Sequence, residues 1–432
     1  MRIIYLHQYF NTPDMAGGTR SYELARRLVR RGHEVHMVTS WREEGRQLDW
    51  FETEEAGIKV HWLPVPYSNH MGYAERIRAF FRFARAAGSK AAALHGDLVF
   101  ATSTPLTIAL PAVYAARRQR IPMVFEVRDL WPELPIAIGA LRNPVAQAAA
   151  RRLERWAYRN SEAVVALSPG MRDGVCRAGY PAERTAVIPN SSDNDLFLPD
   201  SEAGAAFRAA RSWLGERPLL VYTGTFGRIN GVGYLVELAK HLAELAPDVR
   251  ILLLGDGQER ERISALARDV GVLGKNLFME EPLPKKEMPS VLAAANIACS
   301  LFVDLPEMRA NSANKFFDAL ASGTPLLLNY GGWQAELIER SGAGIVTWHL
   351  PVAEAAARVA DALADQPWLK NAANRARKLA EEQFDRDQLA DQLERVLSAA
   401  AAWQGAEAAS ISPGTFDIGR FDTMRSGIRE TR

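Results

Sequence analysis

The sequence predicts an α/β protein with two doubly wound domains, each a mostly parallel sheet covered by helices on both faces. Short apolar runs alternate with segments of helical period, which is the pattern of such sheets. The alternation starts again near residue 218, after the polar, proline-rich stretch "IPNSSDNDLFLPDSE" at 188–202. We therefore expect two domains of similar size with a hinge at this stretch.

Each half contributes its own set of strands. In the N-terminal half, strands are expected at 2–6, 34–40, 97–102, 122–127 and 163–168, with helices at 23–31 and 143–157. In the C-terminal half, strands are expected at 218–224, 249–255, 276–280, 297–302, 325–329 and 343–348, with helices at 233–245 and within 352–403. The expected division is 1–190, 191–375, a C-terminal helix at 376–403 that packs back toward the N-terminal domain, and a disordered tail at 404–432.

Composition excludes several classes of protein. The chain has 432 residues with 48% hydrophobic and 24% charged side chains, as in globular proteins with large cores. A net charge of +1 gives no global footprint for nucleic acid. Two cysteines, Cys176 and Cys299, are too few for a disulfide framework and favour a reducing cytosol. The N-terminus has no signal-peptide pattern, and no apolar run reaches the roughly 18 residues of a membrane span.

In each half, a glycine-containing loop follows the first strand. Gly17 and Gly18 precede Arg20 and a helix, and Gly224 precedes Arg228 in "TGTFGRINGVGYL". Ligands of doubly wound sheets bind beyond the carboxyl ends of the strands. Backbone N–H groups at such glycines, with a guanidinium, suit a diphosphate. The alternative is an ordinary loop with a surface arginine. "LLLGDG" at 252–257 is explained equally well by a tight turn.

Charged residues also end the strand "FEVRDLWPEL" at 125–134. Charges at the end of a buried strand are costly unless they are paired or face a ligand. We expect Arg128, Asp129 and Glu133 to orient an acceptor hydroxyl, with Asp129 as a candidate base. The alternative is an Arg–Asp pair that fixes the Trp131–Pro132 turn.

The stretch "ANSANKFFDALASGTPLLLNYGG" at 310–332 places Lys315 and Asp318 one helical turn apart. Lys315 is a candidate to neutralise a leaving diphosphate, and Asp318 to accept hydrogen bonds from a ribose diol. The residues around the helix start, Asn311, Ser312 and Asn314, are candidate donor ligands. The alternative is a surface ion pair that contributes little.

A basic, aromatic helix is expected within 68–94. If it lay on an anionic bilayer, the contacting residues would be drawn from its arginines and phenylalanines. These are Arg76, Phe80, Phe81, Arg82, Phe83 and Arg85. The alternative is a core helix with a solvated basic face. No metal is expected, because "DND" at 193–195 lies in the hinge, where Asp and Asn favour turns.

At this point the sequence resembles the retaining glycosyltransferases of the GT-B fold, in which two Rossmann-like domains face one cleft. The resemblance covers roughly residues 1–400. It is closest to the large bacterial group that builds O-antigen, capsule and exopolysaccharide, and more narrowly to N-acetyl-fucosaminyl transferases. It rests on "GGTRSYELARRL", "FEVRDLWPE", "VVALSPGMRD", "VIPNSSDNDLF", "YTGTFGRINGVGYLVELA", "LLLGDG" and "NKFFDALASGTPLLLNYGGWQAELI".

The resemblance implies a nucleotide-sugar donor, favouring UDP, held mostly by the C-terminal domain. The family's motif has two glutamates, of which the second binds ribose. Asp318 stands at the second position, whereas Ala310 replaces the first. The family's diphosphate pair is Arg and Lys. Arg228 matches, but Asn230 lies near the lysine position, and Lys315 is the candidate replacement.

The resemblance also implies a front-face reaction with retention, no metal cofactor, and a lipid-diphosphate or saccharide acceptor bound on the N-terminal side. The enzyme would then work at the cytoplasmic face of the inner membrane. Two rivals stay open. A non-hydrolysing UDP-sugar 2-epimerase needs no acceptor, and a non-catalytic partner subunit of the same fold, suggested by Ala310, turns over nothing alone.

Overall fold

The computed structural model describes all residues except 16, 44–48, 68–70, 192 and 403–432, and the predicted tail at 404–432 lies outside the described part. The described chain divides into two compact units. Unit 1 comprises Met1–Asn190, Ala310–Ser312 and the chain from Arg386, and unit 2 comprises Ser191–Arg309 and Ala313–Asp385. The helical segment assigned to unit 1 thus begins at Arg386 rather than at the expected residue 376.

Unit 1 contains an eight-stranded sheet with the order β3-β4-β2-β1-β5-β6-β7-β8. Its strands are β1 (Arg2–Leu6), β2 (Glu34–Trp41), β3 (Phe51–Glu55), β4 (Ile58–Pro64), β5 (Leu98–Thr102), β6 (Met123–Val127), β7 (Ala163–Ala166) and β8 (Thr185–Val187). All neighbours pair in parallel except the hairpin of β3 and β4 at one edge. The five expected strands are confirmed, whereas β3, β4 and β8 were not predicted.

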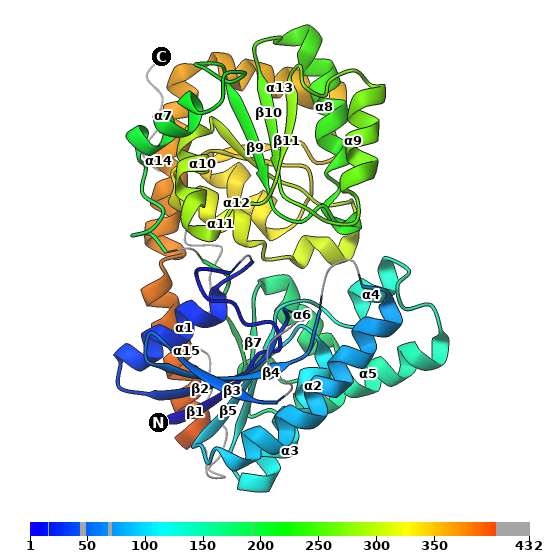
Figure 1. Cartoon of the computed structure of the whole chain (residues 1–432), viewed down its shortest axis with the longest axis vertical. Helices are drawn as coiled ribbons and strands as arrows, with labels where there is room; N and C mark the ends of the chain where they lie inside the picture. The colour runs from blue at the N-terminus through cyan, green and yellow to red at the C-terminus, as the bar shows by residue number, and fades with distance from the viewer. Residues whose placement is uncertain (16, 44–48, 68–70, 192, 403–432) are drawn as a thin grey trace, which may run out of the picture. The chain divides into compact units, whose positions relative to one another are not determined.

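Helices cover both faces of this sheet (Figure 1). On one face, α1 (Arg20–Arg30) and α15 (Arg386–Ala402) pack on a core that includes Tyr5 and Leu393. The other face carries helices that share a core with Phe125. These are α2 (Tyr73–Ala93), α3 (Ala109–Gln119), α5 (Pro144–Arg159) and α6 (Pro169–Arg177), and the short α4 (Glu133–Ala137) precedes α5.

Unit 2 contains a six-stranded parallel sheet with the order β11-β10-β9-β12-β13-β14. Its strands are β9 (Leu219–Thr223), β10 (Arg250–Leu254), β11 (Leu277–Glu280), β12 (Ile297–Ser300), β13 (Leu326–Leu328) and β14 (Gly344–Val346). Its helices are α7 (Ser201–Ala209), α8 (Gly233–Leu245), α9 (Arg260–Asp269), α10 (Met288–Ala294), α11 (Asn314–Ala321), α12 (Trp333–Ser341), α13 (Val352–Ala364) and α14 (Gln366–Gln383). Helices α8, α9 and α13 pack on one face (Figure 1). The two predicted doubly wound sheets are therefore confirmed.

The helix that was expected to contact a membrane is α2. One of the six residues predicted to make this contact lies in the core instead. Phe83 is fully buried in the core of unit 1, so the expectation that it contacts a bilayer is wrong. Phe80 and Arg76 are partly buried, with Phe80 packed near Tyr9. The exposed members are Phe81, Arg82 and Arg85. Among the described residues, no helix combines the length and apolar character needed to cross a membrane.

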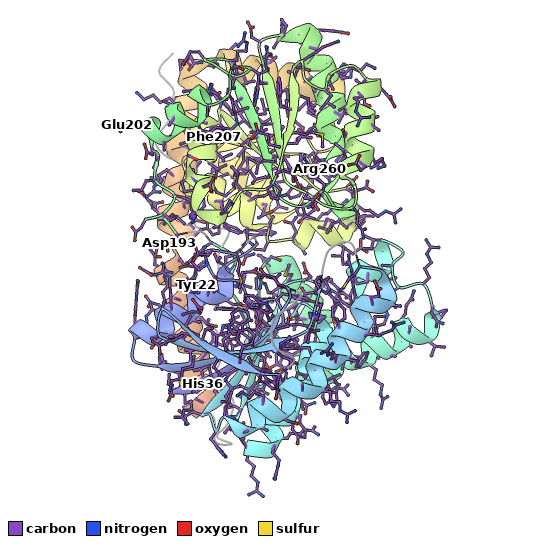
Figure 2. The ribbon with its side chains drawn as sticks, viewed as in Figure 1. Tyr22, His36, Asp193, Glu202, Phe207 and Arg260 are labelled. Atoms are coloured by element: carbon purple, nitrogen blue, oxygen red, sulfur yellow. The ribbon has the colours of Figure 1, made fainter. Side chains whose placement is uncertain are left out.

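The "DND" segment forms a turn in unit 2, as its residue types favour. The carbonyl of Asp193, labelled in Figure 2, accepts hydrogen bonds from the N–H groups of Leu196 and Phe197. The Asn194 amide donates to the Ala380 carbonyl. This segment is tied to protein groups by its backbone and by Asn194, which agrees with a structural role.

A buried acid in α5 makes the stability of unit 1 depend on pH. Glu154 is 3% exposed, and burial together with the charge of Glu133 raises the pKa of its carboxyl to about 8. Between the unfolded value of roughly 4.3 and 8, the folded state therefore holds a proton that the unfolded state has lost. Stability must fall as pH rises through this window.

We expect Glu154→Gln to remove this loss, because the amide keeps the acceptor for the Tyr158 hydroxyl and cannot ionise. The gain over the wild type should reach a few kcal/mol, an order-of-magnitude figure, above pH 8 and vanish near pH 4. Urea unfolding at pH 6 and pH 9 measures it, with the exposed Glu183→Gln as the control. If the free energy of unfolding changed equally between pH 6 and pH 9 in the wild type and both variants, Glu154 would not be the source of the pH dependence.

Candidate functional site

The loop after β9 is where the structure brings the predicted anion-binding groups of unit 2 together. Gly224 follows the strand with φ +132°, a conformation that L side chains rarely adopt. A Cβ atom at Gly224 would lie 3.1 Å from the Lys315 Nζ atom. The backbone conformation thus favours glycine at this position, and the Lys315 Nζ atom lies directly against it.

Lys315 reaches this loop from α11. Its Nζ atom lies 3.9 Å from the centroid of the Tyr222 ring, a cation–π contact. The atom is buried and has no hydrogen-bond partner. Burial lowers the pKa of the Lys315 amine to about 7, although the nearby Cys299 acts in the opposite direction. A buried amine with three unused donors at a glycine loop is suited to an arriving anion.

Lys315 and Asp318 share a helix but no contact is found between them. Asp318 forms an ion pair with Lys285, which follows β11 in the sequence and also lies 4.6 Å from the Phe197 ring centroid. The alternative of a surface Lys315–Asp318 pair is therefore wrong. Asp318 is 9% exposed and its carboxylate is held in place, as a group that accepts hydrogen bonds from a diol should be. Sequence reasoning missed Lys285.

Arg228 lies at the start of a short 3₁₀ turn in the same loop and is partly buried. Within the described ranges, its guanidinium has no ion pair, so its charge is available to a ligand. The loop itself is supported from the neighbouring strand. Cβ atoms at Gly255 or Gly257 would collide with the backbone of Gly224 or Phe226. Arg260, labelled in Figure 2, donates to the Gly255 carbonyl.

"GDG" at 255–257 is therefore a tight packing element that shapes the arginine-bearing loop. This matches the alternative of a turn considered from the sequence. These contacts do not indicate that Gly255 or Gly257 binds a ligand.

The segment before α11 belongs to unit 1. The Ala310 carbonyl accepts a hydrogen bond from the Ser168 hydroxyl at 2.5 Å, and a Cβ at Gly170 would lie 2.8 Å from the Ala310 Cβ. Ala310, which the sequence resemblance aligns with the first glutamate of the motif, is thus packed tightly on α6. The small side chain fits this contact.

The three candidate donor ligands of this segment differ in their surroundings. The Ser312 hydroxyl accepts from the Asn190 N–H at 3.2 Å, and its carbonyl accepts from the Asn190 side-chain amide. Asn311 is buried, and Asn314, the first residue of α11, is partly buried. Ser312 is therefore at least partly a structural residue.

Arg20 does not have the predicted role. Its Nε and Nη2 atoms donate to Glu126 at 3.0 and 2.8 Å, and Nη1 donates to the Pro189 carbonyl at 2.6 Å. Arg20 is 4% exposed and Glu126 is fully buried. The expectation that this guanidinium binds a diphosphate is wrong, because its N–H groups already donate to acceptors within unit 1. Gly18 is held by Asn11, whose amide donates to its carbonyl, and Gly17 is exposed.

Arg128 and Asp129 follow β6 and make separate contacts. The Thr104 hydroxyl donates to Asp129 Oδ2 at 3.0 Å, and the Arg128 Nη1 atom lies 3.2 Å from His7 Nε2. Burial raises the pKa of the Asp129 carboxyl, and the Thr104 hydrogen bond opposes this. The alternative of an Arg–Asp pair is not observed. Glu133 instead begins α4, near Glu154, with Oε2 buried and without a partner.

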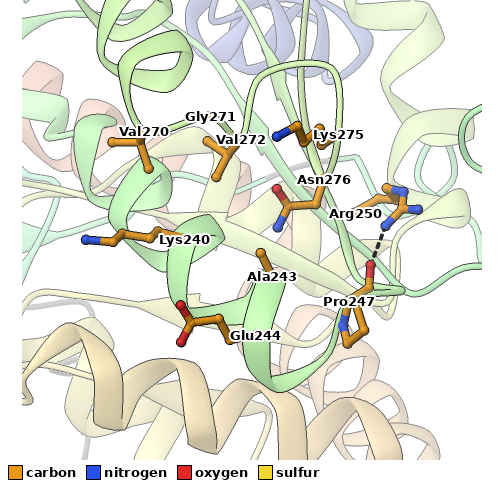
Figure 3. A pocket seen from close by; sticks show the side chains of 10 residues that line it. All are labelled: Lys240, Ala243, Glu244, Pro247, Arg250, Val270, Gly271, Val272, Lys275 and Asn276. Atoms are coloured by element: carbon orange, nitrogen blue, oxygen red, sulfur yellow. Dashed lines mark hydrogen bonds between the residues drawn. The ribbon is translucent and has the colours of Figure 1, made fainter.

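A separate pocket of about 500 Å³ lies at the opposite edge of the unit 2 sheet, where β10 begins (Figure 3). Lys240, Arg250 and Lys275 give it a basic lining, with Glu244 as its acidic residue. No predicted site residue contributes to this lining. Within the described ranges, no three or more His, Cys, Asp and Glu side chains are grouped so that they could hold a metal ion.

Comparisons with known proteins relate both halves of the chain to glycosyltransferase families. Residues 16–191 match the family described as glycosyl transferase 4-like domain, and residues 205–398 match the glycosyl transferases group 1. A GDP-mannose-dependent alpha-(1-6)-phosphatidylinositol monomannoside mannosyltransferase of Mycolicibacterium smegmatis is 25% identical over 62% of this chain. The match spans 66% of that relative, just under two-thirds of its length.

Solved structures show the same fold. Sucrose-phosphate synthase from Thermosynechococcus elongatus superposes with a TM-score of 0.76 and 19% identity, over 92% of this chain and 99% of that one. The HepE protein of Anabaena, solved in complex with UDP and glucose, gives a TM-score of 0.68 with 19% identity, over 92% and 100%.

The fold and the family matches, which together extend from residue 16 to residue 398, define the chain as a glycosyltransferase. Residues 205–398 belong to the glycosyl transferases group 1, residues 16–191 belong to the glycosyl transferase 4-like domains, and the chain has the GT-B fold.

Proposed function

We propose that the chain transfers a sugar from a nucleotide-sugar to an acceptor hydroxyl with retention of configuration. The observation that carries this proposal is the buried, unpartnered amine of Lys315 beside Gly224, in the loop that also bears the unpaired Arg228. A leaving diphosphate gains negative charge as the bond to the sugar breaks. Preorganised cations at that point stabilise the transition state more than the ground state.

The proposed roles of the other residues follow from their contacts. Asp318, fixed by Lys285, accepts hydrogen bonds from the ribose hydroxyls. Asp129, held by the Thr104 hydroxyl, orients the acceptor hydroxyl by a hydrogen bond. In the front-face reaction, the acceptor oxygen attacks the face that the diphosphate leaves, and the leaving phosphate oxygen takes the hydroxyl proton. These steps require no metal from the protein.

For the donor we propose a UDP-sugar, and for the acceptor a lipid-linked or saccharide molecule of bacterial surface polysaccharide synthesis. This narrower assignment rests on the resemblance of the quoted motifs to those of N-acetyl-fucosaminyl transferases, and for the donor also on HepE, a protein of similar fold that was solved with UDP and glucose. The exposed Phe81, with Arg82 and Arg85 beside it on α2, supports peripheral binding to the cytoplasmic face of the inner membrane.

A titration of the whole chain with UDP, GDP and ADP tests the donor site. We expect UDP to bind best and Asp318→Asn to weaken it by roughly 1–3 kcal/mol, the cost of losing a charged hydrogen-bond partner. The exposed Asp361→Asn on α13 is the matched control and should bind like the wild type.

The outcomes separate the rival functions. An unchanged affinity in Asp318→Asn would remove Asp318 from the donor site. Binding of none of the three nucleotides would favour a non-catalytic partner subunit. Conversion of a UDP-sugar to its epimer without an acceptor would show a 2-epimerase.

A further inference from the structure

Three neighbouring strands of unit 1 deliver polar side chains to one edge of its sheet. His7 follows β1, Ser103 and Thr104 follow β5, and Arg128 follows β6. The strand order places β1 beside β5 and β5 beside β6, all parallel. The Ser103 hydroxyl accepts a hydrogen bond from the Arg128 N–H at 3.0 Å, which fixes the backbone at the start of this loop.

The His7 ring has a buried N–H group without a hydrogen-bond acceptor. Its Nε2 atom lies 3.2 Å from the Arg128 guanidinium, which can only donate, so Nε2 accepts and the proton is assigned to Nδ1. The Nδ1 atom is buried and has no partner, and the residue is 4% exposed. Burial, followed by the charges of Arg128 and Arg42, holds the pKa of His7 well below its usual range. The ring is therefore neutral at physiological pH.

Neither Arg128, which lies beside His7, nor Arg42, which follows the neighbouring strand β2, is neutralised by an ion pair among the described residues. The Arg42 guanidinium donates to Asn11 Oδ1, an uncharged acceptor, and Arg128 contacts His7. In the described part of the chain, neither forms a salt bridge. The nearby acids are engaged elsewhere. Glu126 pairs with Arg20, and the partly buried Asp129 accepts from Thr104.

Apolar surface lies next to these cations. Tyr9 packs against Tyr67 with ring centroids 4.5 Å apart, and Phe80 lies 6.3 Å from Tyr9. The Tyr67 N–H donates to the Arg42 carbonyl at 3.4 Å, so the aromatic cluster adjoins the basic one. Both amide atoms of the buried Gln8 side chain also have no partner. Unsatisfied buried polar groups are costly unless a ligand or water satisfies them.

We propose that His7, Arg42 and Arg128 bind a phosphate group of the acceptor, with His7 Nδ1–H and the two guanidinium groups as donors. The ligand class is a phosphate or diphosphate ester with an apolar or sugar substituent that contacts Tyr9 and Tyr67. This inference rests on the proposed function, and it narrows the acceptor to an anionic one. Guanidinium groups and a neutral imidazole N–H match the donors that phosphate oxygens require.

The first test measures binding of farnesyl diphosphate and of pyrophosphate to the whole chain. Arg128→Gln and Arg42→Gln should each weaken farnesyl diphosphate about ten-fold or more, as expected for a lost charged hydrogen bond. Arg118→Gln, which removes an exposed arginine of α3, is the control and should change nothing. Affinity for UDP should stay at the wild-type value in all three variants.

The outcomes distinguish the sources of phosphate. Unchanged farnesyl diphosphate affinity in both variants overturns the proposal. A parallel loss of UDP affinity also overturns it, because the site would then serve the donor. If UDP fails to bind the wild type while farnesyl diphosphate binds through Arg128, the proposed donor is wrong but the phosphate site stands.

A second test observes the wild-type protein and uses one variant only to assign a signal. In the wild type labelled with nitrogen-15 at histidine, pyrophosphate should shift the Nδ1–H signal of His7, assigned by its loss in His7→Gln. The neutral tautomer should persist. No shift at saturating pyrophosphate would overturn the role of His7 as a phosphate ligand.

Discussion

Lys315→Met is expected to lower kcat by about 10²–10³-fold, the effect of removing one preorganised electrostatic donor from a transition state. Methionine keeps most of the side-chain volume against Tyr222 but carries no charge. Because the charge acts on a leaving group that becomes more negative, the loss in rate should exceed the loss in nucleotide affinity. The exposed Lys370→Met on α14 is the matched control and should retain activity.

The same residue should make nucleotide binding depend on pH. With a pKa of about 7, the Lys315 amine is partly neutral in the free protein at pH 7.5. A bound diphosphate favours its charged form and raises this pKa, so binding takes up part of a proton. UDP affinity should therefore decline as pH rises above 7.

Calorimetry of UDP binding in buffers with different ionisation enthalpies measures this proton uptake. The terminal phosphate of UDP titrates in the wild type and in Lys315→Met, so the difference between the two proteins isolates Lys315. Equal proton uptake in the two would argue against a diphosphate contact. Equal losses in rate and affinity would instead indicate plain ground-state binding.

For Lys315 and Asp318, the sequence predicts their shared helix but not the partner of each side chain. Periodicity predicted α11 and placed Lys315 and Asp318 on one face, because residues i and i+3 are neighbours on a helix. The sequence cannot show that each has a different partner. Lys315 reaches Tyr222 and Gly224, whereas Asp318 pairs with Lys285. The position of Lys285 after β11 is the signal that could have found it.

The strand pattern was predictable where strands are buried and continuous. The hairpin of β3 and β4 escaped because β3 is a short, charged edge strand, "FETEE". Its turn, Ala56–Gly57, lacks the Asn-Gly or Asp-Gly pair that commonly marks two-residue hairpins. The position of His7 at the end of a predicted strand is a weak sequence indication of a functional site. Its orphaned Nδ1 atom depends on Arg128, which is 121 residues away in the sequence.

Arg20 shows most clearly why residue type and spacing are insufficient. An arginine after two glycines at a helix start suits an anion site equally well whether its partner is a diphosphate or a carboxylate. The partner here is Glu126, 106 residues along the chain and fully buried. Burial alone would raise the pKa of Glu126, but the charges of Arg20 and Arg128 outweigh it and hold that pKa below its usual value.

Glu126→Ala is therefore expected to destabilise unit 1 by about 3–5 kcal/mol, the cost of leaving a buried guanidinium without its counter-ion. Arg20 also donates to the carbonyls of Ile188 and Pro189, so its displacement would loosen the end of unit 1 as well as the start of α1. Urea unfolding followed by tryptophan fluorescence measures the change.

The double variant Arg20→Met with Glu126→Leu separates a structural pair from a ligand site. Replacing both charges with apolar groups removes the uncompensated ion, so the double variant should be more stable than the sum of the single effects predicts. Its affinity for UDP should equal that of the wild type, since neither side chain is available to a ligand. Additive destabilisation would contradict the structural pair, and a loss of UDP binding in the folded double variant would return Arg20 to the donor site.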